Sequence, residues 1–463
     1  MLQYQDLNPQ LLAAEYAVRG VLTQRAQELE QKGRQIIYCN IGNPHTFLQK
    51  PISYVREILS LVEYPELINH QHKSQLFHSD SIKRAREILS YIPEGTGAYS
   101  TTMGIEFIRR AVADFIQKRD NIFSDFKRII LTDGASEAAQ MVITAIIKSP
   151  TDGILVPIPQ YPLYNASLKL RGGASIAYYL DEDNGWQLDE QALETSITQA
   201  RGNGITAKAI TVINPGNPTG AVLSYSNIQM IIRFAQKYNL SIMADEVYQE
   251  NIYNPKHTFH SFAKVMHDMQ INDVSLFSFH SMSKGYFGEC GHRAAYFEIR
   301  NVPDDAFSQL VKLKSINLCA NVTGQIATYL MVTPPNPGEE SYPVYLAEKQ
   351  AILNDLREKS IIIGEELNKI PGISVNSPDG AMYAFVKLEL PEHMMEIAKS
   401  TNSNLDEMYC LALLEETGIC VVPGSGFGQK PGTLHFRMTF LPAKDQIINL
   451  INQLKSFHLK FTQ

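Results

Sequence analysis

The sequence has no long uninterrupted apolar run, no long basic run and no low-complexity segment. Its apolar stretches all fall short of the roughly 20 residues that a membrane-spanning helix needs, and the first ten residues lack the apolar centre of a secretory signal. The formal net charge is −7, which argues against nucleic acid or an anionic membrane surface as the main partner. We therefore expect no membrane partner and no nucleic-acid partner.

Cysteine is also scarce, with five residues in a chain of 463. The five are odd in number, widely spaced and without a close metal-type pair, and the twelve histidines show no zinc-ligand spacing. This usage argues against a disulfide framework and favours a reduced, cytoplasmic location. We expect no bound metal.

The order of predicted elements gives the fold class. From about residue 81, apolar strands alternate with amphipathic helices such as 135–147 and 225–238. Strand–helix alternation with continuously apolar strands predicts an α/β fold with a mostly parallel sheet that is covered on both faces. The candidate strands are 128–132, 153–157, 209–214, 241–245, 274–279 and 293–298.

The two ends of the chain differ from this pattern. Residues 9–33 form a charged amphipathic segment that predicts a helix, and residues 36–44 predict a short strand and turn. The proline-rich stretch 333–338 marks a boundary, after which a long helix (345–369) and strands near 373–375, 381–388, 419–423 and 433–439 predict a smaller α+β domain. We predict an N-terminal arm and small-domain segment (1–75), a large domain (76–332) and a C-terminal small domain (333–463).

The segment that follows the strand 274–279 is the most informative one for chemistry. Lys284 lies between small and hydroxyl-bearing residues, with Ser281 before it and Arg293 after it. An ammonium group is costly in a dry pocket at a strand end, so this lysine can act as a neutral amine nucleophile toward carbonyl groups. Ser281 and Arg293 could hold a phosphate beside it. This combination is the equipment for a pyridoxal phosphate Schiff base, although so short a motif, taken alone, is far more often a serine-rich turn with a solvated lysine.

Ligands of open α/β sheets bind outside the carboxyl ends of the strands, so the residues that follow the other strands matter too. After 128–132, small residues and Ser136 open a helix whose N-terminus could bind an anion, or Asp133 and Ser136 could simply cap it. After 153–157, Tyr161 could place its ring on a flat cofactor, or it could be an ordinary packed aromatic residue.

Two further strand ends carry polar side chains. The segment 214–220 is extremely dense in turn residues, which favours a site where the Asn217 amide donates to a ligand oxygen. Asp245 directly follows an apolar strand, where a carboxylate is costly unless it meets a cation such as a protonated pyridine nitrogen. Tyr248 lies three residues further on, and its hydroxyl could reach the oxygen on the same ring.

Arg437 lies within an apolar, strand-like run in the small domain. A buried guanidinium needs a carboxylate partner, which could be a substrate carboxylate bound in two parallel hydrogen bonds or a structural salt bridge. The nearby glycine-rich segment 424–428 lacks dinucleotide-binding spacing, because Gln429 occupies the third glycine position, and it predicts a flexible turn beside the site.

With these residues in this order, the chain resembles the class I and II aminotransferases, and within them the alanine aminotransferase subfamily, along nearly its whole length. Many separated segments carry the resemblance, and chance agreement over all of them is negligible. They are AEYAVRG (14–20), NIGNPH (40–45), GAYS (97–100), TDGAS (132–136), VPIPQYPLY (156–164), NPGNPTG (214–220), DEVYQENIY (245–253), SKGYFGECG (283–291) and VVPGSGFGQKPGTLHFRMTFLP (421–442).

The resemblance implies the fold type I of pyridoxal 5′-phosphate-dependent enzymes, with a mostly parallel seven-stranded sheet in the large domain and a smaller α+β domain. It implies that Lys284 binds the cofactor covalently and shuttles the proton, and that Asp245 pairs with the ring nitrogen. The other implied roles are ring-oxygen contacts by Asn217 and Tyr248, stacking by Tyr161, phosphate binding by Ala135, Ser136, Ser281, Ser283 and Arg293, substrate α-carboxylate binding by Arg437 with Gly42 and Asn217 nearby, and a phosphate contact across a homodimer interface by Tyr99.

The implied reaction transfers an amino group between small amino acids and 2-oxo acids, with L-alanine and 2-oxoglutarate as the expected pair. Glutamate–glyoxylate, aromatic or kynurenine-type transamination and a β-lyase reaction are alternatives, as is a non-catalytic cofactor-binding protein. The sequence shows no motif for the arginine with which aspartate aminotransferases bind a side-chain carboxylate.

Overall fold

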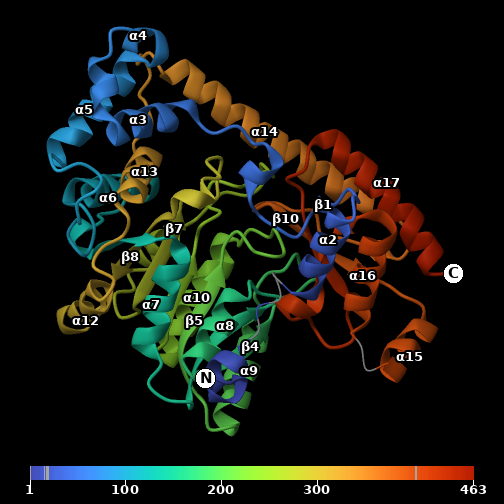
Figure 1. The fold of residues 1–463 in the computed structure, drawn as a ribbon. Helices are drawn as coiled ribbons and strands as arrows, with labels where there is room; N and C mark the ends of the chain where they lie inside the picture. The colour runs from blue at the N-terminus through green and yellow to red at the C-terminus, as the bar shows by residue number, and fades with distance from the viewer. Residues whose placement is uncertain (1, 15, 17–19, 402–403) are drawn as a thin grey trace.

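The computed structural model describes residues 2–14, 16, 20–401 and 404–463, and for residues 397–401 it describes the backbone alone. The central element is a seven-stranded sheet with the strand order β2-β8-β7-β6-β5-β3-β4 (Figure 1). Neighbouring strands are parallel, except that β8 runs antiparallel to both of its neighbours. The strands are β2 (Ile129–Asp133), β3 (Asp152–Ile158), β4 (Ala174–Tyr179), β5 (Thr206–Ile213), β6 (Ser241–Asp245), β7 (Leu276–Ser281) and β8 (Ala294–Arg300).

The six strands expected in this sheet are all present, and the structure adds the edge strand β4. Helices cover both faces, so side chains of one strand enter two different cores: Ile210 and Val212 of β5 pack into one cluster, and Ala209 and Ile213 pack into the other. This two-sided burial is why the central strands read as continuous apolar runs. In β4, exposed and buried residues alternate instead, which is why the search for continuous apolar strands missed it.

The helices of the large sheet form two layers. Helices α9 (Glu190–Gly202), α10 (Tyr225–Tyr238) and α11 (Phe262–Asp268) contribute to the core on one face. Helices α7 (Ala135–Ile146), α8 (Leu163–Leu170) and α12 (Asp304–Ser315) contribute to the core on the other. Helices α3 (Ser53–Glu63), α5 (Ser79–Tyr91), α6 (Glu106–Asp120) and α13 (Val322–Val332) share a further cluster, and the short helix α4 (Lys73–Leu76) lies beside them in Figure 1.

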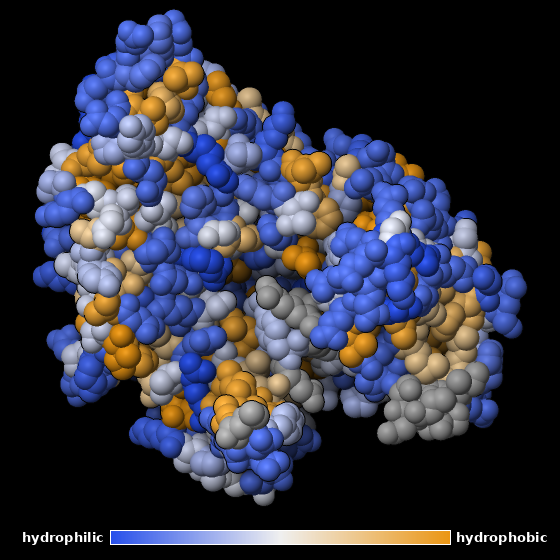
Figure 2. Space-filling view, in the orientation of Figure 1, coloured by the Kyte–Doolittle hydropathy of each residue, from blue (hydrophilic) through white to orange (hydrophobic). Residues whose placement is uncertain are grey.

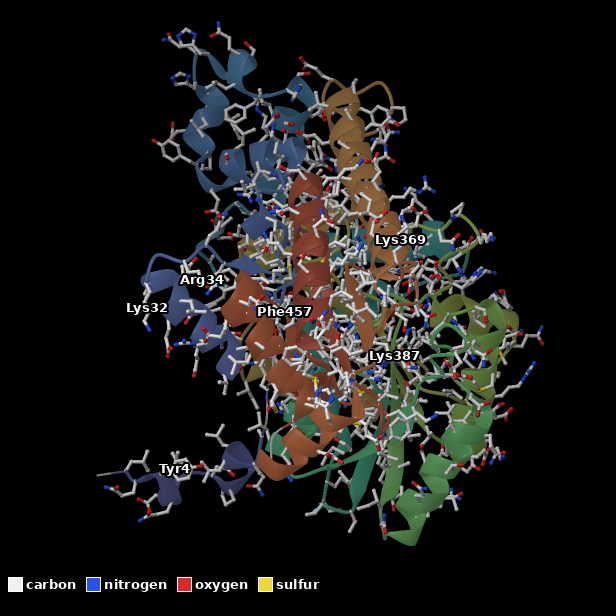
Figure 3. The ribbon with its side chains drawn as sticks, turned by 90° about the vertical axis from the view of Figure 1, so that its right-hand side faces the viewer. Tyr4, Lys32, Arg34, Lys369, Lys387 and Phe457 are labelled. Carbon is white, nitrogen blue, oxygen red and sulfur yellow. The ribbon has the colours of Figure 1, made fainter. Side chains whose placement is uncertain are left out.

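A second, antiparallel sheet has the order β12-β13-β10-β9. Its strands are β9 (Ile373–Ser374), β10 (Tyr383–Leu388), β12 (Val422–Pro423) and β13 (His435–Thr439), while β1 (Ile37–Tyr38) pairs with β11 (Ile419–Cys420). Around them lie α14 (Tyr342–Leu367), α15 (Glu392–Thr401), α16 (Leu405–Thr417) and α17 (Lys444–Phe461). Figure 3 shows α14 and α17 side by side, and Phe457 of α17 belongs to the core under this sheet.

The N-terminal segment differs from expectation. Instead of one helical segment over 9–33, the structure has α1 (Pro9–Leu12) and α2 (Val21–Gln31), with Gly20 at the N-cap of α2. The expected strand at 36–44 is reduced to the two residues of β1, because its partner β11 is equally short. The division into domains at 75/76 and 332/333 stays a prediction.

Most of the face in Figure 2 is hydrophilic, with apolar residues scattered between polar ones. Among the described helices, none combines the length and the apolar character that a bilayer crossing requires.

Candidate active site

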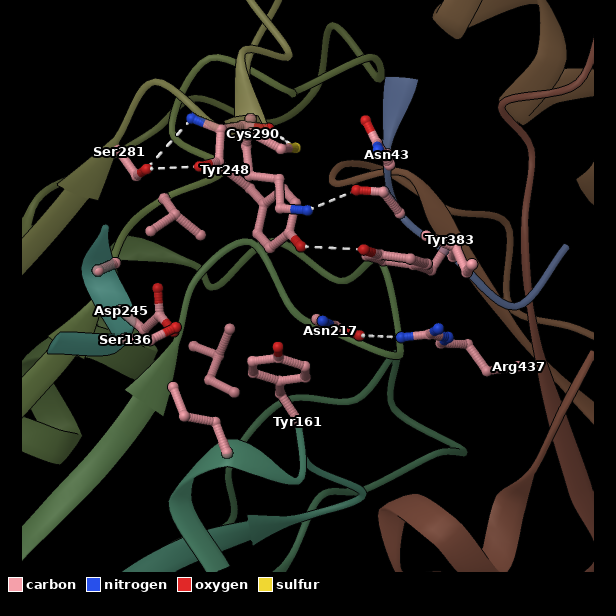
Figure 4. A pocket seen from close by; sticks show the side chains of 18 of the residues that line it. Asn43, Ser136, Tyr161, Asn217, Asp245, Tyr248, Ser281, Cys290, Tyr383 and Arg437 are labelled. Atoms are coloured by element: carbon pink, nitrogen blue, oxygen red, sulfur yellow. Dashed lines mark hydrogen bonds between the residues drawn. The ribbon is translucent and has the colours of Figure 1, made fainter. Parts of the chain in front are cut away.

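A cavity of about 780 Å³ lies at the carboxyl ends of β5, β6 and β7 (Figure 4). Strands of the large sheet supply one side, and β10 and β13 of the small sheet supply the other. Twelve of the thirteen residues predicted for the site line this cavity. They are Gly42, Ala135, Ser136, Tyr161, Asn217, Asp245, Tyr248, Ser281, Ser283, Lys284, Arg293 and Arg437.

Lys284 enters the cavity from the loop that follows β7. Its Nζ donates a 2.7 Å hydrogen bond to the carbonyl oxygen of Gly42 and lies 5.8 Å from the centre of the Tyr248 ring. Gly42 has to lack a side chain here, because a Cβ atom would lie 1.7 Å from the Tyr383 hydroxyl. The lysine is therefore held at the junction between the two sheets, as a half-buried amine facing the cavity.

Asp245 ends β6 and is buried. Its Oδ2 accepts a 2.8 Å hydrogen bond from the Tyr164 hydroxyl, while Oδ1 has no hydrogen-bond partner among the described residues. Burial raises the pKa of this carboxyl to about 6, although the Tyr164 hydrogen bond and the Lys284 charge oppose the rise. An ionised, half-satisfied carboxylate in such a place favours a cationic ligand.

An anion cradle lies at the N-terminus of α7. This end has no side-chain cap, so its backbone N–H groups can bind an anion. Gly134, with φ +86°, leaves room for Arg293, whose Nη2 would lie 2.0 Å from a Cβ atom at that position. Ser281 and Ser283 are joined by a 3.0 Å hydrogen bond between their hydroxyls. The predicted helix cap by Asp133 or Ser136 is not formed, which leaves the end open for a phosphate.

Arg437 is fully buried and has no carboxylate partner among the described residues. Its Nη2 donates to the carbonyl oxygen of Asn40 at 2.5 Å, and its Nη1 donates to Oδ1 of Asn217 at 3.3 Å. Its Cζ lies 4.4 Å from the centre of the Tyr383 ring and 4.6 Å from that of Phe427. Among the described residues the structural salt bridge considered from sequence is thus not formed, and the Nε of Arg437 has no hydrogen-bond partner there. A buried guanidinium beside two rings and without a carboxylate among these residues is suited to a ligand carboxylate.

Sequence reasoning missed Tyr383, which lies between the two cations of the site. Its hydroxyl accepts a 3.3 Å hydrogen bond from the Tyr248 hydroxyl. Burial alone would raise the pKa of Tyr383, but the charges of Lys284 and Arg437 hold it below the ordinary value. A tyrosine within an apolar strand reads as a core residue, so no sequence signal marked it.

Tyr164 was also missed, because its position in α8 reads as ordinary helix packing. Tyr161, three residues earlier, does line the cavity, and its hydroxyl is 2.7 Å from that of Tyr16. Within the AEYAVRG segment, Glu15 and residues 17–19 lie outside the described residues. Tyr99, the thirteenth predicted residue, does not line the cavity: its side chain is 81% exposed.

The residues present fit pyridoxal phosphate. The partnerless Oδ1 of Asp245 suits a protonated ring nitrogen, and the uncapped α7 with Arg293 suits the phosphate. Tyr161 would flank the planar ring, Asn217 and Tyr248 would contact its oxygen, and Lys284 would supply the amine for the aldehyde, since all four line the cavity.

The family model for aminotransferases of class I and II matches residues 73–454. The chain is 46% identical to alanine aminotransferase 1, mitochondrial, of Arabidopsis thaliana, over 98% of this chain and 86% of that protein. It is 44% identical to glutamate–glyoxylate aminotransferase 2 of the same plant, over 99% of this chain and 96% of that protein. Among solved structures, an alanine aminotransferase from Pyrococcus furiosus matches with a TM-score of 0.80 and 27% identity, over 98% of this chain and all of that one.

Proposed function

Because the chain belongs to the class I and II aminotransferases, we propose that it transfers the amino group of L-alanine to 2-oxoglutarate, giving pyruvate and L-glutamate by a ping-pong mechanism. It is an enzyme of fold type I and depends on pyridoxal 5′-phosphate, as this family does. Arg437 lines the same cavity as Lys284 and meets no carboxylate among the described residues, and this observation supports the substrate class best.

When bound, the cofactor supplies an electron-accepting ring that makes the Cα–H bond of an amino acid acidic. Asp245 keeps a proton on the ring nitrogen, because an ionised buried carboxylate strongly favours a cation beside it. Arg437 binds the substrate α-carboxylate in two parallel hydrogen bonds and so orients the Cα–H bond. Lys284 Nζ then takes the proton from Cα as the general base and gives it up again as the general acid. Burial of Asp245 and Arg437 keeps water away from these charges.

Steady-state kinetics tests the substrate assignment. We expect alanine with 2-oxoglutarate to give the highest kcat/KM among alanine, glycine, aspartate and aromatic donors, with parallel double-reciprocal lines. Pyruvate formed from alanine should match glutamate one to one. An enzyme that turns over other donors while leaving alanine untouched would refute the assignment.

A second candidate is transamination between glutamate and glyoxylate. Sequence similarity favours it: the chain is 44% identical to a plant glutamate–glyoxylate aminotransferase, nearly as high as its identity to the alanine enzyme. Replacing 2-oxoglutarate by glyoxylate in the same assay separates the two functions. The kcat/KM of the preferred acceptor should exceed that of the other acceptor by at least tenfold.

We also propose a cytoplasmic homodimer with shared active sites. The support for the dimer is Tyr99: its ring is 81% exposed although its family counterpart contacts phosphate, so a second chain is needed to place it. Sedimentation of the purified enzyme tests the dimer, and fractionation of the source cells tests the location.

A further inference from the structure

Beyond the cavity, an ion pair links the large sheet to the strand that carries Arg437. Glu182 belongs to the hairpin that follows β4, the edge strand of the large sheet. Its Oε1 lies 3.1 Å from Nε2 of His435, and its Oε2 lies 3.5 Å from Nζ of Lys387. His435 lies on β13 and Lys387 on β10, where the two are paired in register. One carboxylate thus bridges two side chains of the small sheet, His435 and Lys387.

Polar groups hold both ring nitrogens of His435. Its Nδ1 lies 3.1 Å from Oε1 of Gln429, whose amide nitrogen is turned toward Asp406 and donates to it at 3.3 Å. Its Nε2 faces Glu182, so both ring nitrogens have an oxygen beside them and the ring is fixed in one orientation. His435 is 2% exposed, and a buried polar ring of this kind needs its partners. Burial would raise the pKa of Glu182, but His435 and Lys387 hold the pKa of Glu182 below its ordinary value.

The same face of the small sheet connects this pair to Arg437. His435 and Arg437 are two residues apart on β13, so their side chains share one face. Phe385 is the register partner of Arg437 and shares that face too. The rings of Phe385 and His435 are stacked, with centres 4.5 Å apart and planes 8° from parallel. Phe385 also meets Phe427 edge to face at 6.1 Å, and Phe427 lies under the guanidinium.

A chain of contacts thus runs from Glu182 through His435, Phe385 and Phe427 to Arg437. Arg437 has no carboxylate of its own to hold it among the described residues. Its position depends on the rings and on the neutral groups of Asn40 and Asn217. A shift of Phe427 would therefore move the guanidinium from the orientation in which it can bind a carboxylate in the cavity.

We propose that the Glu182–His435 pair positions Arg437 for binding the substrate carboxylate, acting through Phe385 and Phe427. The proposal rests on the proposed function insofar as Arg437 binds the substrate. Neither Glu182 nor His435 lines the cavity, so both are positioning residues and touch no reacting atom.

The experiment compares Glu182→Gln with wild-type holoenzyme. Glutamine keeps the shape and an acceptor oxygen but removes the negative charge that faces His435 and Lys387. We expect KM for alanine to rise about tenfold, as for the loss of about 1.4 kcal/mol of binding, with kcat within about twofold. The dissociation constant of propionate, an unreactive carboxylate of the same carbon length, should rise equally in calorimetric titration. Cofactor content and absorption spectrum should not change.

Three variants separate positioning from general loosening. Glu182→Asp, which keeps the charge, should recover most of the affinity. The double variant Glu182→Gln/His435→Gln should bind alanine and propionate no more weakly than the more impaired of the two single variants, because the two residues act as one unit. Glu194→Gln, which breaks the exposed Glu194–Lys237 pair on α9, is the matched control and should leave every constant unchanged.

Unchanged KM and propionate affinity in a folded Glu182→Gln enzyme would overturn the proposal, as would a parallel loss of kcat, cofactor and affinity. Additive effects in the double variant would do the same. The proposed function fails separately, if the wild-type enzyme does not transaminate alanine, and the propionate titration remains informative in that case because it needs no turnover.

Discussion

The hydroxyl of Tyr164 donates a 2.8 Å hydrogen bond to Oδ2 of Asp245, and both side chains are buried. The tyrosine comes from α8 and the aspartate from the end of β6, so the pair joins a helix to the sheet that it covers. The hydrogen bond favours the ionised carboxylate and leaves Oδ1 as the oxygen that faces a ligand. Tyr164 therefore supports the charge on which cofactor chemistry depends.

Two variants of this pair should differ in kind. Asp245→Asn removes the anion, so turnover should fall by a factor on the order of 10² to 10³, while the phosphate contacts still retain cofactor.

Tyr164→Phe leaves the anion but raises the pKa of Asp245 from about 6. As the pH is lowered, this variant should therefore lose cofactor affinity at a higher pH than the wild-type enzyme does. Titration of apoenzyme with cofactor from pH 5 to 8 measures this midpoint, and a shift toward lower pH would contradict the role of Tyr164.

Lys284 should carry the cofactor covalently. The purified enzyme should be yellow, should bleach with borohydride, and should yield one reduced peptide that contains Lys284. Lys284→Ala should bind cofactor without this link and lose turnover. Lys349→Ala, which removes another lysine that lies over an aromatic ring at 4.5 Å, should still be trapped. Finding the adduct on any other lysine would rule out the assignment.

Arg437→Lys should impair both half-reactions, since every substrate presents an α-carboxylate. Lysine keeps the charge but loses the flat fork and the contact with both rings, so kcat/KM for alanine should fall by about 2–4 kcal/mol in barrier terms. Cofactor binding should hardly change, because the phosphate cradle is elsewhere. Arg110→Lys, at an exposed guanidinium 3.7 Å above the Phe126 ring, is the control. If only the glutamate half-reaction suffered, Arg437 would instead be the reader of the side-chain carboxylate.

Shared active sites would appear in mixed dimers. Tyr99→Phe and Lys284→Ala chains should each be impaired alone, whereas their hybrid has one site that carries neither lesion. Refolding an equal mixture should recover about one quarter of the wild-type activity, because half of the random dimers are hybrids. Tyr64→Phe, at a tyrosine that is 60% exposed, should be fully active by itself. A fully active monomer would disprove shared sites.

The apoenzyme should lose stability as the pH rises, because of Glu246. Burial raises the pKa of this carboxyl to about 7, with Arg119 opposing the rise, whereas an unfolded glutamate has a pKa near 4.3. As the pH rises, Glu246 keeps its proton in the folded state after it has lost it in the unfolded state. The contribution of Glu246 to the free energy of unfolding is therefore fully present below pH ~4 and is lost as the pH rises through about 7. The loss is on the order of 3 kcal/mol. Denaturant titrations of Glu246→Gln should give a flatter pH profile between 5 and 8, and an unchanged slope would exclude Glu246 as its source.

The chemistry at the strand ends could be predicted from residue order alone. Apolar runs located six strands of the large sheet, and parallel strands bring their carboxyl ends to one edge. That rule was enough to expect Asn217, Asp245 and Lys284 in one site, since each lies at the end of such a strand or within five residues of it. It also placed α10 at its observed bounds, 225–238, where the helical period is unbroken.

The surroundings of these residues follow from long-range packing. Tyr164 and Tyr383 belong to segments that are typical of packed cores and Phe427 to an expected turn, and they acquire roles because the fold brings them next to Asp245 and Arg437. The same holds for His435, whose partner Glu182 lies more than 250 positions away in the chain. Local patterns report which side chains are buried, but the partner of a buried charge is set by long-range packing. For that reason the sequence could name Arg437 and not what holds it.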